Sequence, residues 1–350
     1  MKYYITYNKT IETNPNRTLL DILNGVTNEI TTGKKTIYVE TTEEELLQKI
    51  QQKFTRCPLK PKEIAPEDIA YNTFMIPKKS GGYRTINAPK EKLMQLLTDY
   101  RYQLENTNTL VHDAAHAYVK GRSTLTALKE HQKNKSKHFL KIDFQDFFGS
   151  FTKERILEQL KQIYPFCGIL LHNETEVSTM LDHCLKDGVL PQGTPVSPLL
   201  TNICMIPIDA KIAATCKKAG YIYTRYADDI LISSKQPFKF YDLVKFIDEK
   251  LTPEWLRINP NKTRYGSNGG RNWNLGLMLN KDNKITIGHK KKEILKATIH
   301  HALTDDLSAQ EKMEIQGYIA YAYQIEPDYV TTIIRRLEEK TQQNLRQRLK

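Results

Sequence analysis

The sequence predicts an α+β fold in which a central sheet is followed by a helical C-terminal part. Apolar runs rich in β-branched and aromatic residues occupy the middle of the chain, and after Ile287 the apolar residues recur at helical spacing. Of the 350 residues, 39% are hydrophobic and 26% are charged, which is the composition of an ordinary globular protein. This length suits two or three subdomains around a substantial core.

The net charge favours a polyanionic partner. There are 52 Lys and Arg against 40 Asp and Glu, so the formal charge is +12. Nucleic acid is the expected partner, and an ordinary solvated basic surface is the alternative. We expect no membrane span, because no apolar run approaches ~18 residues, and no secretion signal at the start of the chain. The five cysteines form no Cys-x-x-Cys pair. This pattern argues against a disulfide framework and a zinc site, and it fits the reducing cytoplasm.

The central strands are expected in two places. Residues 138–144 form an apolar run that contains one acid, and a helix is expected to follow, with Thr152 as its N-cap. Residues 221–226 and 230–233 are two β-rich runs, and the short acidic stretch between them predicts a hairpin.

Acidic residues stand at the ends of these strands. Asp228 and Asp229 lie at the expected hairpin tip, and Asp143 ends the first strand. Adjacent acids are common in polar turns, but their mutual repulsion is costly unless a cation is present. Carboxylates from two neighbouring strands can bind two Mg²⁺ ions for in-line phosphoryl transfer. The spacing therefore predicts a metal-dependent phosphoryl-transfer site, with a polar turn as the alternative.

The tip, Tyr226-Ala227-Asp228-Asp229, resembles the Tyr-x-Asp-Asp signature of reverse transcriptases. Further segments resemble other motifs of that family and follow in its order. They are the fingers segment Pro77–Arg84, the first palm motif Phe139–Phe148, the Leu-Pro-Gln-Gly motif Leu190–Pro198, the lysine motif Pro260–Thr263 and the primer grip Leu275–Leu277. The resemblance covers about residues 70–340, which is most of the chain.

The resemblance implies a right-hand polymerase fold with fingers, palm and helical thumb. The expected division is an N-terminal extension over 1–48, the first part of the fingers over 49–137, a palm with an interleaved fingers segment over 138–280, and a thumb over 281–350. The implied reaction is RNA-templated addition of dNMP to a primer 3′-hydroxyl group. The implied cofactor is a pair of Mg²⁺ ions, with Mn²⁺ as a substitute.

The resemblance also implies roles for individual residues. Lys262 is the expected general acid that protonates pyrophosphate, with a plain surface charge as the alternative. The expected catalytic residues are Asp143, Asp228, Asp229 and Lys262, and the expected metal ligands are Asp143, Asp228, Asp229 and the carbonyl group of Phe144.

A second group of residues is expected to hold the dNTP and the primer. The basic residues would bind the triphosphate, unless they only form a solvated turn, and Gly193 would permit close backbone approach. Phe148 would exclude a ribose 2′-hydroxyl group, with an ordinary core aromatic as the alternative. The expected dNTP-binding residues are Lys78, Lys79, Arg84, Asp146, Phe147, Phe148, Gln192 and Gly193, and those of the primer grip are Leu275 and Gly276.

The subgroup indicated is that of retron-like or other defence-associated bacterial reverse transcriptases. The chain has no room for maturase and endonuclease extensions, and no RNase H-like second half is evident. Two retron hallmarks are altered: only His131 remains of Asn-Ala-x-x-His, and 274–276 reads Asn-Leu-Gly instead of Val-Thr-Gly. These changes favour the wider defence-associated group.

The expected partners are a structured non-coding RNA template, a DNA primer and product, and dNTPs, with a companion effector protein or a homo-oligomer in addition and no membrane. Basic residues of the thumb would contact the RNA, unless they are ordinary solvated helix faces. These residues are Lys290, Lys291, Lys292, Arg335, Arg336, Arg346 and Arg348. The alternatives are a retron enzyme making RNA-linked single-stranded DNA, untemplated or protein-primed DNA synthesis, an RNA-dependent RNA polymerase, and a silent RNA-binding scaffold.

Overall fold

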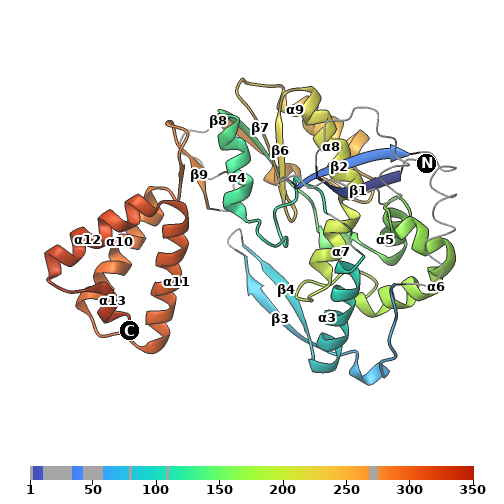
Figure 1. Ribbon diagram of the computed structural model, residues 1–350, viewed down its shortest axis with the longest axis horizontal. Helices are drawn as coiled ribbons and strands as arrows, with labels where there is room; N and C mark the ends of the chain where they lie inside the picture. Colours follow the sequence, from blue (N-terminus) through green and yellow to red (C-terminus); the bar gives the residue numbers. More distant parts are fainter. Residues whose placement is uncertain are drawn as a thin grey trace.

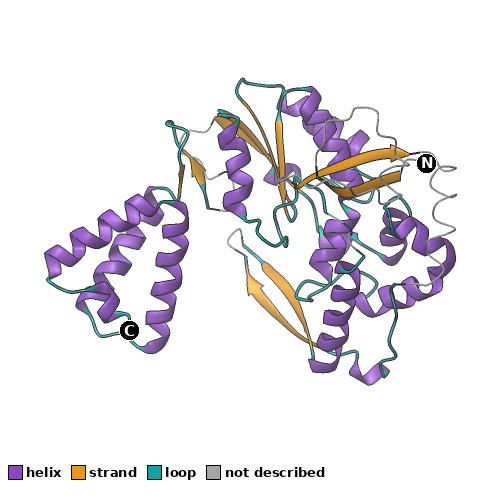
Figure 2. Cartoon of the chain, in the orientation of Figure 1, coloured by secondary structure: helices purple, strands orange, loops and turns teal. Residues whose placement is uncertain are grey.

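A four-stranded antiparallel sheet forms the centre of the molecule (Figure 1). The computed structural model describes residues 3–10, 34–41, 58–78, 81–107, 109, 111–267, 273 and 276–350. The strands of the central sheet are β5 (His138–Asp143), β6 (Ile222–Tyr226), β7 (Asp229–Ser234) and β8 (Arg264–Ser267), in the order β6-β7-β5-β8. Helices lie around this sheet and a separate group of helices stands at the C-terminal end (Figure 2), which confirms the expected α+β class.

The predicted hairpin is confirmed as β6 and β7. Tyr226 pairs with Asp229 at its closed end, so Ala227 and Asp228 form a two-residue turn. Ala227 has a φ of 57°, a left-handed conformation that tight hairpin turns demand and that alanine rarely adopts. Strand β5 pairs with the other edge of β7, and Asp143 stands directly opposite Asp229.

The two faces of the sheet pack against different structures. On one face, Leu140 and Ile142 of β5 and Ile230 of β7 belong to the main hydrophobic core. The helices that supply residues to this core are α3 (Glu91–Glu105), α5 (Lys153–Leu160), α6 (Phe166–Cys184), α7 (Ser197–Cys204) and α8 (Ile206–Lys218). Because side chains alternate along a strand, Asp143 and Asp229 point to the opposite face.

Short helices and caps complete this part of the chain. The predicted N-cap of α5 is confirmed, since the Thr152 hydroxyl group accepts a hydrogen bond from the Arg155 backbone. Helix α4 (Thr124–Lys133) starts with a capping box between Ser123 and Thr126. The remaining elements are α9 (Phe240–Phe246), the short helices Pro66–Asp68, Phe148–Ser150 and Pro260–Lys262, and a π-helical turn Ile247–Leu251.

Two further hairpins lie outside the central sheet. Strands β3 (Tyr71–Pro77) and β4 (Tyr83–Pro89) form an antiparallel pair that is mostly exposed. Strands β1 (Tyr3–Thr10) and β2 (Lys34–Thr41) form another antiparallel pair.

The helical C-terminal part lies at one end of the molecule (Figure 1). It is joined to the rest through the short strands β9 (Met278–Leu279) and β10 (Ile285–Thr286). Its helices are α10 (His289–Thr304), α11 (Ala309–Ile325), α12 (Pro327–Thr341) and α13 (Leu345–Arg348). A second hydrophobic cluster runs from these helices to Leu128 of α4 and to Phe139 and Leu231 on the acid-bearing face of the sheet. All four helices fall within the expected thumb, and the exact domain boundaries stay a prediction.

The cysteines of the described residues are free thiols. Cys167, Cys184, Cys204 and Cys216 are all buried, and Cys57 lies outside the described residues. Within the same part of the chain, no single helix is long and apolar enough to cross a membrane, and only the bent pair α7 and α8 passes that test together.

Candidate active site

Three carboxylates meet where β5 and the β6–β7 turn end. Asp143 is 6% exposed and faces Asp229 across the strand pair. Asp228 occupies the second position of the turn and is half-buried. The structure thus brings together the three acids that the sequence singled out.

Two lysines neutralise part of this acidic cluster. The Lys262 ammonium group lies 2.9 Å from Oδ1 of Asp143, and that of Lys141 lies 2.7 Å from Oδ2 of Asp229. Lys141 is two residues before Asp143 on the same strand, so it shares the face of the acids. The sequence did not single out Lys141, although its period-2 spacing from Asp143 was a usable signal.

The environment of the acids disfavours three negative charges. Burial raises the pKa of Asp228, and the charges of Asp229 and Asp143 raise it further. Burial also raises the pKa of Asp229, while Lys141 opposes that rise. A cation at this place would relieve the repulsion between the carboxylates.

The described residues contain no group of three His, Cys, Asp or Glu side chains already positioned to hold a metal ion. Lysine ammonium groups instead contact an oxygen of Asp143 and an oxygen of Asp229. The donor set is nevertheless the hard-oxygen set that Mg²⁺ prefers.

A fully buried arginine contacts the β6–β7 turn from the core. The Arg225 guanidinium group donates 2.8 Å and 2.7 Å hydrogen bonds to the two carboxylate oxygens of Asp209. It also donates to the side-chain oxygen of Asn202 at 3.1 Å and to the carbonyl group of Ala227 at 3.0 Å. The phenol of Tyr223 donates to Asp209 as well. This network links a core helix to the strained residue of the turn, a link that no local pattern in the sequence reveals.

The segment after Asp143 turns sharply. Asp146 has a φ of 39°, and its side chain leaves no space for a Cβ on Gly149. The Phe147 ring is buried and packs edge-on against Phe148, with ring centroids 5.6 Å apart. Phe148 itself is only partly buried at the edge of the core. The ring of Phe147 is therefore core, and only its backbone amide group remains a candidate for phosphate contact.

The β3–β4 hairpin, called the fingers hairpin below, touches the Leu-Pro-Gln-Gly motif. The backbone N–H of Asn87 on β4 donates to the Gln192 carbonyl group at 2.8 Å. Gly193 has a φ of 109°, and a Cβ there would lie 2.8 Å from Ile86 and 3.0 Å from the Asn87 carbonyl oxygen. The missing side chain of Gly193 therefore allows its backbone to lie close to β4.

The expected triphosphate-binding residues belong to the same hairpin. Arg84 stands two residues before Ile86 on β4, so both point to the face that meets Gly193. Lys78 is exposed at the end of the hairpin, and Lys79 lies outside the described residues. In the expected primer grip, Leu275 also lies outside them, while Gly276 has a φ of 101°.

Two of the thumb lysines are used inside the protein. Lys291 donates to the Gly276 carbonyl group at 3.1 Å, and its ammonium group lies 5.4 Å from the centre of the Tyr321 ring. Lys292 lies 2.6 Å from Glu326 and 4.4 Å from the centre of the Tyr329 ring. Both lysines therefore have intramolecular partners in the structure, and their expected contact with RNA stays a prediction.

The other thumb charges divide in the same way. Arg348 is half-buried and donates to the carbonyl groups of Ala302 and Asp305. The exposed members of the group are Lys290, Arg335, Arg336 and Arg346.

The retained histidine of the altered retron motif joins α4 to the central sheet. His131 is fully buried, and its ring nitrogens lie 2.5 Å from the Ser233 hydroxyl group and 2.9 Å from that of Thr224. These partners belong to β7 and β6, so His131 is a structural bridge within the palm.

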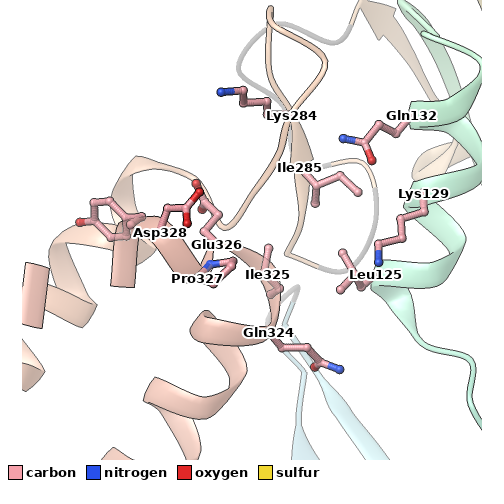
Figure 3. A pocket seen from close by; sticks show the side chains of 11 residues that line it. Leu125, Lys129, Gln132, Lys284, Ile285, Gln324, Ile325, Glu326, Pro327 and Asp328 are labelled. Atoms are coloured by element: carbon pink, nitrogen blue, oxygen red, sulfur yellow. The ribbon is translucent and has the colours of Figure 1, made fainter. Parts of the chain in front are cut away.

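A cavity of about 410 Å³ lies between α4 and the base of the thumb (Figure 3). Lys129 and Gln132 face it from α4, Lys284 from the β9–β10 hairpin, and Glu326 and Asp328 from the corner of α11 and α12. The Gln132 and Asn283 side-chain amides each donate to the other residue's backbone carbonyl group, at 2.8 Å and 2.9 Å. The cavity marks the palm–thumb junction, and none of the three catalytic candidates lines it.

The chain is similar to known proteins of one family. Residues 76–318 match the model of the family described as reverse transcriptase (RNA-dependent DNA polymerase). The Retron Ec83 reverse transcriptase of Escherichia coli is 29% identical over 286 residues, covering 77% of this chain and 88% of that protein. The Retron Ec73 enzyme of the same organism is 30% identical, with the same two coverages. The Retron Mx65 enzyme of Myxococcus xanthus is also 30% identical, over 76% of this chain and 64% of its own length.

Among solved structures, apo telomerase from Candida tropicalis is similar over 86% of this chain and 65% of that one, with 11% identity and a TM-score of 0.47. The family match spans more than half of the chain and includes the Asp143, Asp228 and Asp229 cluster. The chain therefore belongs to the reverse transcriptase family, the RNA-directed DNA polymerases, and is similar to the bacterial retron enzymes within it.

Proposed function

We propose that the cluster of Asp143, Asp228 and Asp229 is where this enzyme adds dNMP to a primer 3′-hydroxyl group under the direction of an RNA template. The observation that supports this most is the meeting of three carboxylates on paired strands with raised pKa values at Asp228 and Asp229. Such crowding costs stability in a plain turn, so a role with a bound cation explains it better.

The donor set fits divalent metal ions. Asp143, Asp228, Asp229 and the carbonyl group of Phe144 would hold two Mg²⁺ ions, with Mn²⁺ as a substitute. When bound, the ions supply Lewis acidity for the primer hydroxyl group and neutralise the charge of the triphosphate. Lys141 and Lys262 stand in as the cations of the cluster in the structure, on Asp229 and Asp143.

Residues around the acids would orient the substrate. Lys262 has half of its side chain exposed, at 52%, so its ammonium group can leave Asp143 and donate a proton to pyrophosphate. Arg84 and Lys78, together with Lys79, would hold the triphosphate from the fingers hairpin. The backbone amide groups of Asp146 and Phe147 would add phosphate contacts.

The remaining residues would shape the nucleotide and primer sites. Phe148, at the edge of the core, would pack against the deoxyribose and exclude a 2′-hydroxyl group. Gln192 and Gly193, which contact β4, would lie beside the incoming nucleotide. Leu275 and Gly276 would support the primer.

A primer-extension assay with purified enzyme tests the proposal. A DNA primer annealed to a defined RNA template should be extended with dNTPs and Mg²⁺, with a sequence that copies the template. Extension of the primer with rNTPs would support an RNA polymerase, and nucleotide addition without a template would support untemplated synthesis. Covalent attachment of labelled nucleotides to the protein itself would support protein priming. No incorporation under any condition would support a silent scaffold.

We further propose a dedicated structured RNA as the template and a role in anti-phage defence in the cytoplasm, with a companion effector protein or a homo-oligomer. The exposed residues Lys290, Arg335, Arg336 and Arg346 offer charge to such an RNA, and RNA can be read through its phosphates without a dedicated module. Cross-linking and sequencing should recover one abundant RNA, less of it from an Arg335→Ala/Arg336→Ala variant. A random RNA mixture, with no loss of phage resistance on deleting the gene, would contradict this.

A second candidate function is a retron enzyme whose product is single-stranded DNA linked to RNA. The names of the similar proteins favour it. Nucleic acid that co-purifies with the enzyme would then contain a DNA strand that shortens on RNase treatment. DNA that is unchanged by RNase would contradict this candidate.

A further inference from the structure

The loop between α3 and α4 runs directly beside the catalytic hairpin. Ala115 forms a parallel bridge with Arg225 of β6. The Arg225 backbone N–H donates to the Ala114 carbonyl group at 2.6 Å, and the His116 N–H donates to the Arg225 carbonyl group at 2.8 Å. The loop is therefore fixed to the strand that leads into the Tyr226–Asp229 turn.

Other contacts make this loop rigid. One nitrogen of the Arg122 guanidinium group donates to the carbonyl groups of His112, Asp113 and Ala115, at 3.0, 3.1 and 2.8 Å. The Asn202 side chain, which also contacts Arg225, donates to the Ala117 carbonyl group at 2.9 Å. The next residue after Ala117 is thus held at a defined position.

That residue, Tyr118, combines strain with exposure. Its φ is 59°, in the left-handed region that favours glycine, and the residue is 55% exposed. Among the described residues, its hydroxyl group has no hydrogen-bond partner. Strained non-glycine residues persist where the surroundings enforce them, and they cluster at functional sites.

Tyr118 lies on the segment that runs beside the Asp228 turn. The bridge between Ala115 and Arg225 is parallel, so Tyr118 and Asp228 each stand three residues further along from it. Partial burial raises the pKa of Tyr118, the charges of Asp228 and Tyr226 raise it further, and the Arg84 guanidinium group lowers it. The phenol is thus within electrostatic range of the catalytic turn and of fingers strand β4. A nucleotide that contacted Arg84 with its triphosphate and Asp228 through metal ions would pass this ring.

We propose that Tyr118 is a nucleotide-positioning residue whose ring packs against the nascent base pair, formed by the incoming dNTP and its template base. This inference rests on the proposed catalytic role of Asp228. An aromatic ring suits the task because every base offers a π-face, so stacking is independent of sequence. A rigid loop suits it because a fixed ring loses little entropy when the base pair forms.

The left-handed backbone of Tyr118 allows a sharp test. In Tyr118→Gly the ring is removed while the backbone conformation becomes easier to adopt, so the Tm should equal or exceed that of the wild type. The KM for dNTP in single-nucleotide insertion should rise about tenfold, which corresponds to ~1.4 kcal/mol, with kcat much less affected. Tyr118→Phe keeps the ring and should remain within about twofold of the wild type, because stacking needs no hydroxyl group.

Gln342→Gly is the matched control, because Gln342 has a φ of 55° at the end of α12 in the thumb. Its Tm should also hold or rise, with an unchanged KM. An unchanged KM in folded Tyr118→Gly would overturn the inference. A lower Tm in Tyr118→Gly, with Tyr118→Phe equally impaired, would instead show a structural tyrosine and overturn it too. Absence of templated extension by the wild type would overturn the proposed function itself.

Discussion

Arg225 offers the most informative perturbation outside the acids themselves. Burial opposes its charge, but Asp209 raises the pKa of Arg225, so the pair is a buried ion pair. In Arg225→Met the Asp209 charge is left buried without its partner, which lowers the free energy of unfolding by about 3–5 kcal/mol. At about 2 °C per kcal/mol for a chain of this size, the Tm should fall by about 6–10 °C. The contact to the Ala227 carbonyl group, whose residue is strained, is lost at the same time.

A double variant separates the two losses. In Arg225→Met/Asp209→Leu the charge is removed from both partners, and apolar replacement of a buried ion pair is often close to neutral for stability. We expect the Tm to recover by more than half, measured by thermal unfolding. Primer extension should stay at least about tenfold below the wild type, because a hydrogen bond from a charged donor to the turn, worth ~1.5–3 kcal/mol, is still missing. Full activity of the double variant would refute the idea that Arg225 holds the turn.

Three further predictions concern single side chains. Phe148→Ala should raise rNTP incorporation relative to dNTP, and an unchanged ratio in a folded, active variant would make Phe148 a packing residue. Lys262→Ala should slow single-turnover incorporation more than it weakens dNTP binding, because a general acid acts in the transition state, whereas a pure loss of affinity would argue against that role. Burial lowers the pKa of His131 from 6.5 to about 3, so the folded protein keeps it neutral while the unfolded chain protonates it below about pH 6.5. The contribution of neutral His131 to the free energy of unfolding is complete above pH 6.5 and is lost as the pH falls towards 3. At pH 5 the loss in free energy of unfolding is about 2 kcal/mol. The Tm of His131→Gln should therefore be lower than that of the wild type at pH 7.5. It should also fall less than that of the wild type between pH 7.5 and 5, and an equal dependence of Tm on pH in the two proteins would contradict this.

Local patterns predicted the centre of the fold well. The β-rich runs on either side of Ala227 gave the β6–β7 hairpin, and Thr152 gave the start of α5. These features depend on alternation, turn chemistry and capping, which act over a few residues. The three acids could be found for the same reason, since Asp143 ends β5 and Asp228 and Asp229 stand at the β6–β7 turn.

Contacts between distant segments were not predictable in this way. Lys291 and Lys292 read as free charges because a helix pattern does not show that Gly276 and Glu326 lie beside them. Tyr118 was overlooked because its position depends on a bridge between Ala115 and Arg225, more than a hundred residues apart in the chain. Gly193 was expected to approach a nucleotide, but the structure shows that β4 already requires the glycine.

Asp143 at the end of β5 and Asp228 and Asp229 at the β6–β7 turn are proposed as the residues at which polymerisation takes place. Asp228→Asn preserves the size of the side chain and removes its charge, and Asp242→Asn makes the same change at an exposed position on α9. Extension of a DNA primer on an RNA template measures this directly, once thermal unfolding has verified that both variants are folded. We predict a loss of extension by orders of magnitude in Asp228→Asn and none in Asp242→Asn. Near-normal extension by Asp228→Asn would contradict the account.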